Sequence, residues 1–518
     1  MTVSGPPRAG GIDFDGVRMH QFRNCILLTG VALIGLSAPA LAAAKKTAPP
    51  PPDPRIGVLE QQLRDIQRQL GEIKAAQGAN DTGASNTSGA VADLKRSSSN
   101  HYVAINNRLD GLNKTVIDNG RLTVSSPNGA FSLSLRALAQ LDAGYFAQGK
   151  NPASVDLNSG TNFRRAQLGF QGTVFKDWAY NFIYDFGGNG VEGRGYIYNA
   201  YIQYDGLKPF GIRIGAYTPF AGIDDQTGSA DMFFAERASA SDIARNIAGA
   251  PSREAVSIFV QGDNYLVSLS YTGKKTGDGT ATGASVGTFD AQQSIIGRAA
   301  WLAVSTPDIK WLVDGHITEV LKLADATASP AATVIRFSNG PELAVDASRT
   351  VDTGNIDANH AREFGFETAA TYQRFYGQGG WFHYQIDRRT AVPNPDFDGW
   401  YAVLGYSLTG EQHPYDPTTA SFRNLRPAKP LGTPGGWGAW EVLARYSSID
   451  LDYQPFASAA SGGIAGGKQD VWTIGLNWYP NNAVKFQLDY NNIKVNHVNA
   501  PANDISADAV VLRSQISL

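Results

Sequence analysis

The chain has 518 residues, a formal net charge of -3, 56 glycines, 21 tyrosines, 24 phenylalanines and one cysteine. This length exceeds one ordinary soluble core, and the nearly neutral charge gives no reason to expect a nucleic-acid partner. Glycine and aromatic residues in this proportion are typical of many strands joined by turns. We therefore expect either several domains or one very large barrel.

The first part of the chain, residues 1–44, has the features of an N-terminal extension and signal peptide. Basic residues precede the apolar run CILLTGVALIGLSAPALAAA, which ends in small residues. This pattern predicts cleavage after Ala42 or Ala44, and translation from Met19 instead of Met1 would give a conventional charged start. Because the only cysteine leaves with this segment, disulfides, thiol chemistry and cysteine-based metal sites are excluded from the mature chain.

Two segments with helical periodicity follow a proline-rich spacer at 45–55. Isoleucines and leucines between positions 56 and 73 recur at alternating gaps of three and four, and the same spacing returns at 102–116 after a Gly/Ser-rich linker at 78–90. A seam this narrow predicts coiled-coil segments over 56–118, most simply with the same helix of a sister subunit. A pair of lone amphipathic helices is the alternative interpretation.

From Arg121 the helical pattern gives way to strict alternation. In the stretches 163–172 and 179–188, apolar and aromatic residues form one row, and Arg, Gln, Asn and Asp form the other. Alternation predicts strands, and lipid outside with water inside also explains why aromatic residues sit at the ends of the apolar rows. A β-sandwich would explain only the alternation. We therefore predict an all-β transmembrane fold, an antiparallel outer-membrane β-barrel of about sixteen strands over 121–518.

The remaining strands are expected in regular succession. They are Leu133–Tyr145, Tyr196–Tyr204, Gly211–Tyr217, Ala255–Gln261, Tyr265–Tyr271, Ser294–Ala303, Ile309–Ile317, Glu363–Tyr372, Trp381–Asp387, Trp400–Leu408, Ala439–Tyr446, Val471–Tyr479, Val484–Asn491 and Ala509–Leu518. Short turns alternate with long loops, of which 218–252 is one. The connection 409–437 is long although it falls on the short-turn side, so either a strand pair is misread or this segment is an ordered plug.

Strand parity assigns nearly equal numbers of basic and acidic residues to the water-filled side. They are Arg136, Arg165, Arg213, Arg298, Lys310, Arg445, Lys485 and Arg513, against Asp142, Asp185, Asp314, Glu363, Glu367, Glu441 and Asp489. Selectivity then depends on position: opposed basic and acidic walls give a transverse field, whereas a basic column attracts anions along the axis. Each residue could also be a solvated wall residue without a selective role.

Other chemistry has little support in the sequence. Gly188, Gly190 and Gly193 spell G-x-G-x-x-G, but another alternating stretch follows instead of a helix, so an ordinary loop is expected. The seven histidines lack metal-ligand spacing, and no cofactor or metal is predicted. There is no G-x-S-x-G elbow, and we expect no enzyme.

Several long stretches resemble the phosphate-selective porin O and P family. They are FRRAQLGFQGTVFKDWAYNFIYDFGG, PFAGIDDQTGSADMFFAERASAS, FDGWYAVLGYSLTGEQHPYD, GGWGAWEVLARYSSIDL and VWTIGLNWYPNNAVKFQLDYN, which together span most of 121–518. The resemblance implies a trimer of sixteen-stranded barrels in the outer membrane of a Gram-negative bacterium. It also implies a third extracellular loop that folds into the lumen and passes anions through a basic constriction, where lysines hold phosphate.

The chain departs from that pattern in two places. It ends in Leu518, where such barrels usually end in an aromatic residue, and its candidate constriction loop is acidic, with no lysine between Lys208 and Lys274. The charged residues singled out on or beside this loop are Asp224, Asp225, Arg237, Arg245 and Arg253. We expect Arg237, Arg245 and Arg253 to be the most relevant to selectivity.

The sequence therefore predicts a homotrimeric outer-membrane porin for passive diffusion of small hydrophilic solutes, preferably anions, with its coiled coil outside the barrel in the periplasm. A general weakly selective porin is one alternative. An envelope tether acting through the coiled coil and a barrel enzyme such as a lipase are the others.

Overall fold

The computed structural model describes residues 54–77, 84–118, 121–150, 155–187, 195–248, 252–276, 292–323 and 333–518. The predicted signal peptide, nearly all of the proline-rich spacer and the glycines at 188–193 lie outside these ranges. The chain divides into two units, residues 1–113 and 114–518.

The first unit contains the helices α2 (Pro54–Gln77) and α3 (Ala84–Asp110). On α2 the predicted seam is uncovered, since Leu63, Ile66 and Leu70 are 59%, 41% and 44% exposed. Within the described residues, no helix is long and apolar enough to cross a membrane. Leu63, Ile66 and Leu70 therefore form an apolar surface that the described part of the chain leaves open.

The boundaries of the helical region differ from the predicted ones. The helix α3 already begins inside the expected linker at 78–90, and it ends before Val116, which was predicted to be a seam residue. Val116 instead lies in β1 (Lys114–Asp118), which pairs with β2 (Arg121–Ser125). The β-branched run Thr115–Ile117 favours a strand over a helix.

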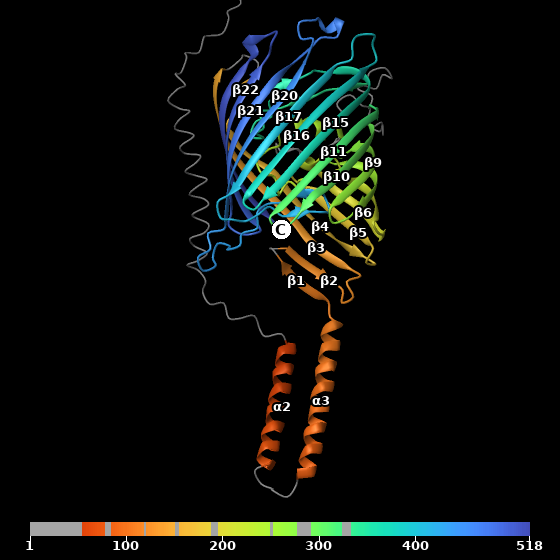
Figure 1. Ribbon diagram of the computed structural model, residues 1–518, viewed down its shortest axis with the longest axis vertical. Coiled ribbons are helices and arrows are strands. Elements are labelled where there is room, and N and C mark those ends of the chain that lie inside the picture. The colour runs from red at the N-terminus through yellow and green to blue at the C-terminus, as the bar shows by residue number, and fades with distance from the viewer. Residues whose placement is uncertain are drawn as a thin grey trace, which may run out of the picture. The chain divides into compact units, whose positions relative to one another are not determined.

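The second unit is a closed barrel that contains sixteen long strands within the described ranges (Figure 1). They are β3 (Ser132–Lys150), β4 (Gly160–Val174), β5 (Trp178–Asp185), β6 (Tyr196–Leu207), β7 (Phe210–Tyr217), β8 (Arg253–Gln261), β9 (Tyr265–Lys275), β10 (Gln293–Ser305), β11 (Ile309–Lys322), β15 (Ile356–Tyr372), β16 (Phe375–Arg388), β17 (Asp396–Ser407), β20 (Ala439–Tyr453), β21 (Ile464–Tyr479), β22 (Val484–Asn496) and β23 (Ile505–Ser517). The predicted fold class and strand number are confirmed.

Antiparallel pairing of β23 with β3 closes the barrel. The pairing extends to the last residue, because the Leu518 N–H donates to the Ala137 carbonyl oxygen at 2.9 Å. A closed sheet leaves no unpaired edge among its strands, as a bilayer requires. Leu518 thus extends the pairing of β23 with β3 by one residue.

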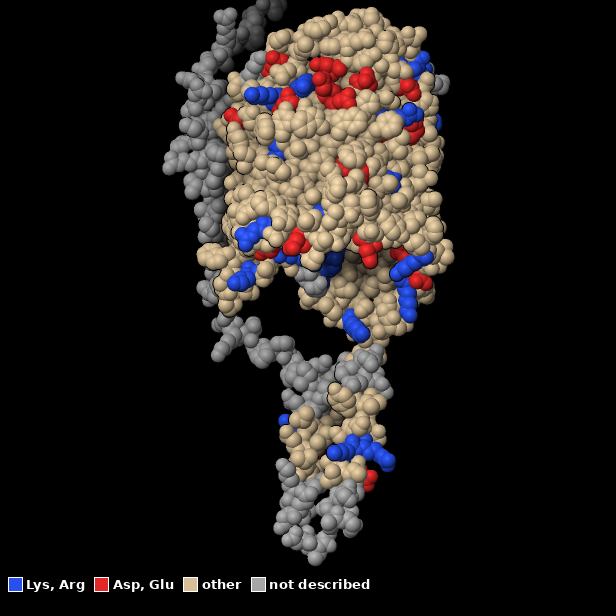
Figure 2. All heavy atoms as spheres, viewed as in Figure 1, with Lys and Arg blue, Asp and Glu red and all other residues tan. Residues whose placement is uncertain are grey.

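Alternation separates an apolar outer face from a polar lumen. In β4, Leu168 and Phe170 are 50% and 44% exposed on the outside, whereas Arg165 and Gln167 are 5% and 8% exposed inside. Asp185 of β5 accepts a hydrogen bond from the Gln167 Nε2 at 2.8 Å. Figure 2 shows the result, a band largely free of Lys, Arg, Asp and Glu between two charged rims.

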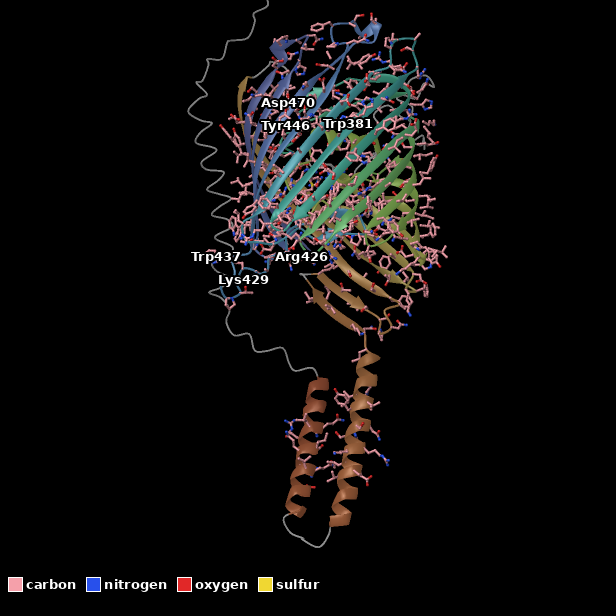
Figure 3. All side chains as sticks on the ribbon, viewed as in Figure 1. Trp381, Arg426, Lys429, Trp437, Tyr446 and Asp470 are labelled. Carbon is pink, nitrogen blue, oxygen red and sulfur yellow. The ribbon has the colours of Figure 1, made fainter. Side chains whose placement is uncertain are left out.

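Aromatic residues lie at both ends of this band. Tyr446 packs against Trp400 and Trp472, with ring centroids 5.1 and 4.7 Å away. At the short-turn end Trp440 and Trp478 stack at 5.3 Å. Figure 3 labels Trp381 and Tyr446 toward one end of the barrel and Trp437 toward the other. Such girdles mark the two membrane interfaces of an outer-membrane barrel.

Candidate functional site

The connection from β7 to β8 folds into the barrel and is fixed there by wall residues. Within residues 218–248 it forms α4 (Ile223–Gln226) and α5 (Ser239–Ala248). The Lys485 Nζ donates to the Met232 carbonyl oxygen at 2.8 Å, and the Ala235 N–H donates to the Asp489 carboxylate at 2.7 Å. Since both wall residues lie on β22, the loop reaches across the lumen from its own strands.

Apolar side chains pack the loop against one side of the barrel. Ala240 and Ile243 of α5 are 0% and 1% exposed, and α5 contacts β15, β16, β17 and β20. Inward-facing polar residues on this side are covered as well, since Thr473, Asp489 and Arg513 are 0% exposed. The half of the lumen along β15–β23 is therefore packed like a protein core.

The segment 408–438 enters the barrel from the short-turn end. It contains β18 (Tyr415–Asp416) and β19 (Ser421–Phe422), and the strands on either side of it, β17 and β20, pair directly with each other. Arg298 of β10 donates to the carbonyl oxygens of Thr419 and Ala420 at 2.7 and 2.8 Å. Arg423 of the segment donates to Asp231 of the constriction loop at 2.9 Å. The predicted strands on either side, β17 and β20, are therefore correct, and the segment 408–438 is an ordered plug.

Three of the six arginines predicted to line the pore are paired with buried carboxylates. Arg513 forms two hydrogen bonds with Asp142, at 2.7 and 2.6 Å, and Arg445 meets Glu342 at 2.6 Å. Arg298, besides holding the plug, is 2.6 Å from Asp314. These three residues face the lumen as predicted, but their charges are neutralised by carboxylates.

The charged residues predicted on the constriction loop largely pair with each other. Arg245 lies 2.7 Å from Asp225, and Arg237 lies 3.3 Å from Asp224. Arg253, at the start of β8, is 5% exposed and donates to the Gly273 carbonyl oxygen at 3.0 Å. In this arrangement the loop arginines stabilise the fold of the loop and its strand.

A different set of inward-facing residues is only partly covered. On β3, β6 and β7, Arg136, Tyr201, Gln203 and Arg213 are half-buried. Arg213 donates to the Gln203 Oε1 at 2.7 Å and lies over the ring of Tyr201, 4.5 Å from its centroid. These strands thus present the more open wall of the lumen.

Arg164 joins this wall although strand parity predicted only Arg165. The pairing of β3 with β4 skips one residue between the pairs Gln140–Arg165 and Leu141–Phe163, so both arginines turn inward. Arg165 donates to the Gln140 Oε1 at 2.7 Å. A single sequence gives no signal for such a bulge.

Arg164 binds the constriction loop through an ion pair with Glu236. Its Nε and Nη2 donate to the two carboxylate oxygens at 2.6 and 2.9 Å. Burial alone would raise the pKa of Glu236, but the charges of Arg164, Arg165 and Arg513 hold that pKa well below its usual range. Glu236 therefore stays ionised and ties the loop to β4.

Comparison with known proteins places this barrel among porins. A family model described as phosphate-selective porin O and P matches residues 133–518. Porin O of Pseudomonas aeruginosa is 25% identical over 431 residues, which cover 78% of this chain and 93% of that protein. An uncharacterized protein of Caulobacter vibrioides is 26% identical over 367 residues, covering 70% of this chain and 69% of that protein.

Two solved structures are also similar. The outer membrane channel DcaP of Acinetobacter baumannii has a TM-score of 0.47 at 11% identity, covering 76% of this chain and 99% of that one. OmpT of Vibrio cholerae has a TM-score of 0.46 at 11% identity, covering 75% and 98%. Because the family model spans well over half of the sequence, the chain belongs to the phosphate-selective porin O and P family, and it forms an outer-membrane channel for solute diffusion.

Proposed function

We propose that small hydrophilic solutes diffuse passively through this barrel, with a weak preference for anions and without a tight phosphate site. The observation that carries this proposal is the contrast between the two sides of the lumen. Inward residues of β20–β23 are buried, whereas Arg136, Arg213, Tyr198 and Tyr201 are half-buried. Solutes would therefore pass along the β3–β7 wall.

The charges on this wall favour anions slightly. Its cations are Arg136, Arg164, Arg165 and Arg213. Apart from Asp142 of β3, which pairs with Arg513 of β23, its anions are Asp185, Asp205 and the loop residue Glu236. Four positive charges minus three negative charges leave an excess of one. A small positive excess in a narrow polar passage raises the local concentration of anions without excluding cations.

Tight phosphate binding has less support than weak anion preference. The loop cations Arg237 and Arg245 already lie beside Asp224 and Asp225. A phosphate ion would have to compete with these carboxylates, and repulsion by them would oppose its approach. Phosphate should therefore pass as one anion among several.

Acidic residues elsewhere in the lumen favour a second candidate function, a general weakly selective porin. Asp314, Glu363 and Glu367 face inward from β11 and β15, away from the basic wall. Opposed walls of this kind give a transverse field with little net selectivity. A ratio of chloride to potassium permeability close to one would favour this function.

Reversal potentials of the purified protein in planar bilayers under a salt gradient test the anion preference. We expect a ratio of chloride to potassium permeability above one, which falls in the double variant Arg136→Gln, Arg213→Gln because two cations leave the open wall. Lys429→Gln is the matched control, since Lys429 is exposed on the plug, and it should leave the ratio unchanged. Cation preference in the wild-type protein, or micromolar block of the chloride current by phosphate, would contradict the proposal.

We also propose that the exposed seam of α2 packs against sister subunits in a homotrimer, with the helices in the periplasm. Leu63, Ile66 and Leu70 supply the apolar knobs such packing needs. Deleting residues 45–113 should leave single-channel conductance unchanged but lower the mass measured by light scattering toward that of a single subunit. Loss of envelope attachment without any change in mass would instead indicate a tether.

The plug depends on a buried histidine. The two ring nitrogens of His413 lie 2.7 Å from the Arg423 carbonyl oxygen and 2.5 Å from the Glu441 carboxylate. Both partners are acceptors, so both nitrogens must donate and the ring must be protonated. Burial opposes this charge, but Glu441 and, more weakly, Asp231 raise the pKa of His413 above its ordinary value.

The stability of the barrel should therefore fall as pH rises. A raised histidine pKa contributes stability that is fully present below the unfolded value of about 6.5 and is lost as pH rises through the folded pKa. At pH values below about 6.5, His413→Gln should lower the free energy of unfolding by roughly 3–5 kcal/mol, because it removes one partner of a buried pair. Denaturant unfolding in detergent, followed by tryptophan fluorescence between pH 5.5 and 9.5, measures both effects.

His360→Gln provides the control, since His360 is exposed on β15 and its loss should change stability by less than about 0.5 kcal/mol. The same pH slope in His413→Gln as in the wild-type protein would show that this histidine does not fasten the plug.

A further inference from the structure

A compact group of ionisable residues lies on the lumen side of β10, β11 and β15, neighbouring strands in Figure 1. Asp314 pairs in register with Glu367, His316 with Gly365 and Thr318 with Glu363. The alternation of the two strands therefore directs one histidine and three carboxylates toward the same side of the sheet. Asp314, Glu363 and Glu367 are at most 1% exposed and His316 is 7% exposed.

The charges in this group do not cancel. Of its three carboxylates, only Asp314 meets an arginine, with Arg298 at 2.6 Å. With His316 neutral, three negative charges minus one positive charge leave an excess of two in this buried site. Buried uncompensated charge is costly, so a group with two positive charges would relieve a substantial penalty.

Several oxygens in the group lack a hydrogen-bond donor. Within the described residues, three of these oxygens accept no hydrogen bond: both carboxylate oxygens of Glu363 and the Oε2 of Glu367. The other oxygen of Glu367 accepts from the Asp224 N–H at 3.2 Å and from the Tyr401 hydroxyl. Buried carboxylate oxygens without a donor are rare in native proteins and indicate a missing partner.

The orientation of His316 points to the kind of partner. Its Nδ1 is 3.0 Å from Asp314, which can accept only if that nitrogen carries the hydrogen. The Nε2 faces the Glu363 Oε1 at 3.2 Å without the geometry of a hydrogen bond, and in the neutral ring this nitrogen carries the lone pair. A carboxylate that orients a histidine whose other nitrogen is free for coordination is a recurrent arrangement at zinc sites.

Space for an ion is present beside these atoms. Asp314, His316 and Glu367 offer ligand atoms that all lie within 4.8 Å of one another. Glu363 is not in that set, but its Oε1 lies 3.2 Å from the His316 Nε2. A cavity of about 10 Å³, close to the volume a single water needs, is lined by His316, Glu363, Glu367 and Gly222. The paired side chains of Arg245 and Asp225, whose charges cancel, also line it. Such a cavity suits one small cation.

Two glycines leave the space that this arrangement requires. A Cβ on Gly222 would lie 1.8 Å from the Glu367 Oε2 and 2.5 Å from the His316 Cε1. A Cβ on Gly365 would lie 2.0 Å from the His316 Nε2. Any larger residue at either position would displace the candidate ligands.

We propose that His316, Glu363 and Glu367 bind a divalent metal ion, with Asp314 as the positioning residue that orients the imidazole. One nitrogen and two carboxylate ligands suit Zn²⁺ better than Ca²⁺ or Mg²⁺, which prefer oxygen ligands alone. The ion would cancel the excess of two negative charges. It would also connect the wall to the constriction loop, since Glu367 accepts a hydrogen bond from Asp224.

Zinc binding to the full-length protein in detergent, after removal of metals with a chelator, tests this proposal by isothermal titration calorimetry. We expect one Zn²⁺ per chain, no comparable binding of Ca²⁺ or Mg²⁺, and at least a tenfold loss of affinity in Glu363→Gln. Asp314→Asn should weaken binding by about 10–100-fold, as loss of a residue that orients a metal ligand does. Bound Co²⁺ should give an absorption spectrum that changes in His316→Gln.

The matched control is His383→Ala. This residue, with Asp396 and Asp398, forms a second group of similar composition that is largely exposed. The control variant should keep the zinc site, and circular dichroism should show an intact barrel in every variant. If zinc does not bind stoichiometrically, the proposal is overturned. The group would then be held together by a shared proton alone. Binding that disappears in His383→Ala but survives in Glu363→Gln would overturn it as well.

Discussion

The period-two alternation of a closed sheet is the constraint on which the rest of this structure depends. One face of every strand meets lipid, so nearly all charges of the membrane-spanning strands must turn into the lumen. There they are crowded and largely shielded from water, and an isolated charge would be costly. The pairs Arg513–Asp142, Arg445–Glu342 and Arg298–Asp314 are consequences of that constraint.

The same constraint explains how the lumen is divided. Carbonyl and carboxylate groups of the constriction loop and the plug satisfy cations of the wall, as Met232 does for Lys485 and Thr419 does for Arg298. These contacts bring both segments against β10–β23 and leave Arg136 of β3 and the inward residues Tyr201, Gln203 and Arg213 of β6 and β7 more open. The paired arginines therefore shape the passage, and Arg136 and Arg213 are better placed to influence ions that move through it.

The sequence predicts the barrel well because its signal is local. Alternation within each strand identifies all sixteen strands, and the contrast between short turns and long loops draws attention to 409–437 as an anomaly. Parity also gives the inward direction of Arg165 and Asp185 correctly. Strand parity fails at Arg164, where a bulge admits one extra residue. Helical periodicity fails at Val116, where strand propensity prevails over an apparent helical spacing.

The candidate sites were harder to predict because they depend on partners that are distant in sequence. Arg237 and Arg245 looked free to bind anions, and only the fold of the loop reveals their carboxylate partners. His316 seemed isolated among scattered histidines, since its neighbours Glu363 and Glu367 belong to the next strand of the sheet. The fold of the loop decides the first case and the register between β11 and β15 decides the second, and a single sequence specifies neither.

The central claim, that solutes move along a weakly basic β3–β7 wall, can be tested by cysteine accessibility, because the predicted mature chain has no cysteine. Single cysteines would be placed at Tyr198 on the open wall and at Tyr401 on the packed one. Small charged thiol reagents would then be applied while current is recorded. The account predicts that Tyr198→Cys reacts, faster with the anionic reagent, while Tyr401→Cys stays unmodified. Equal reaction at both positions, or faster reaction with the cationic reagent at Tyr198→Cys, would contradict it.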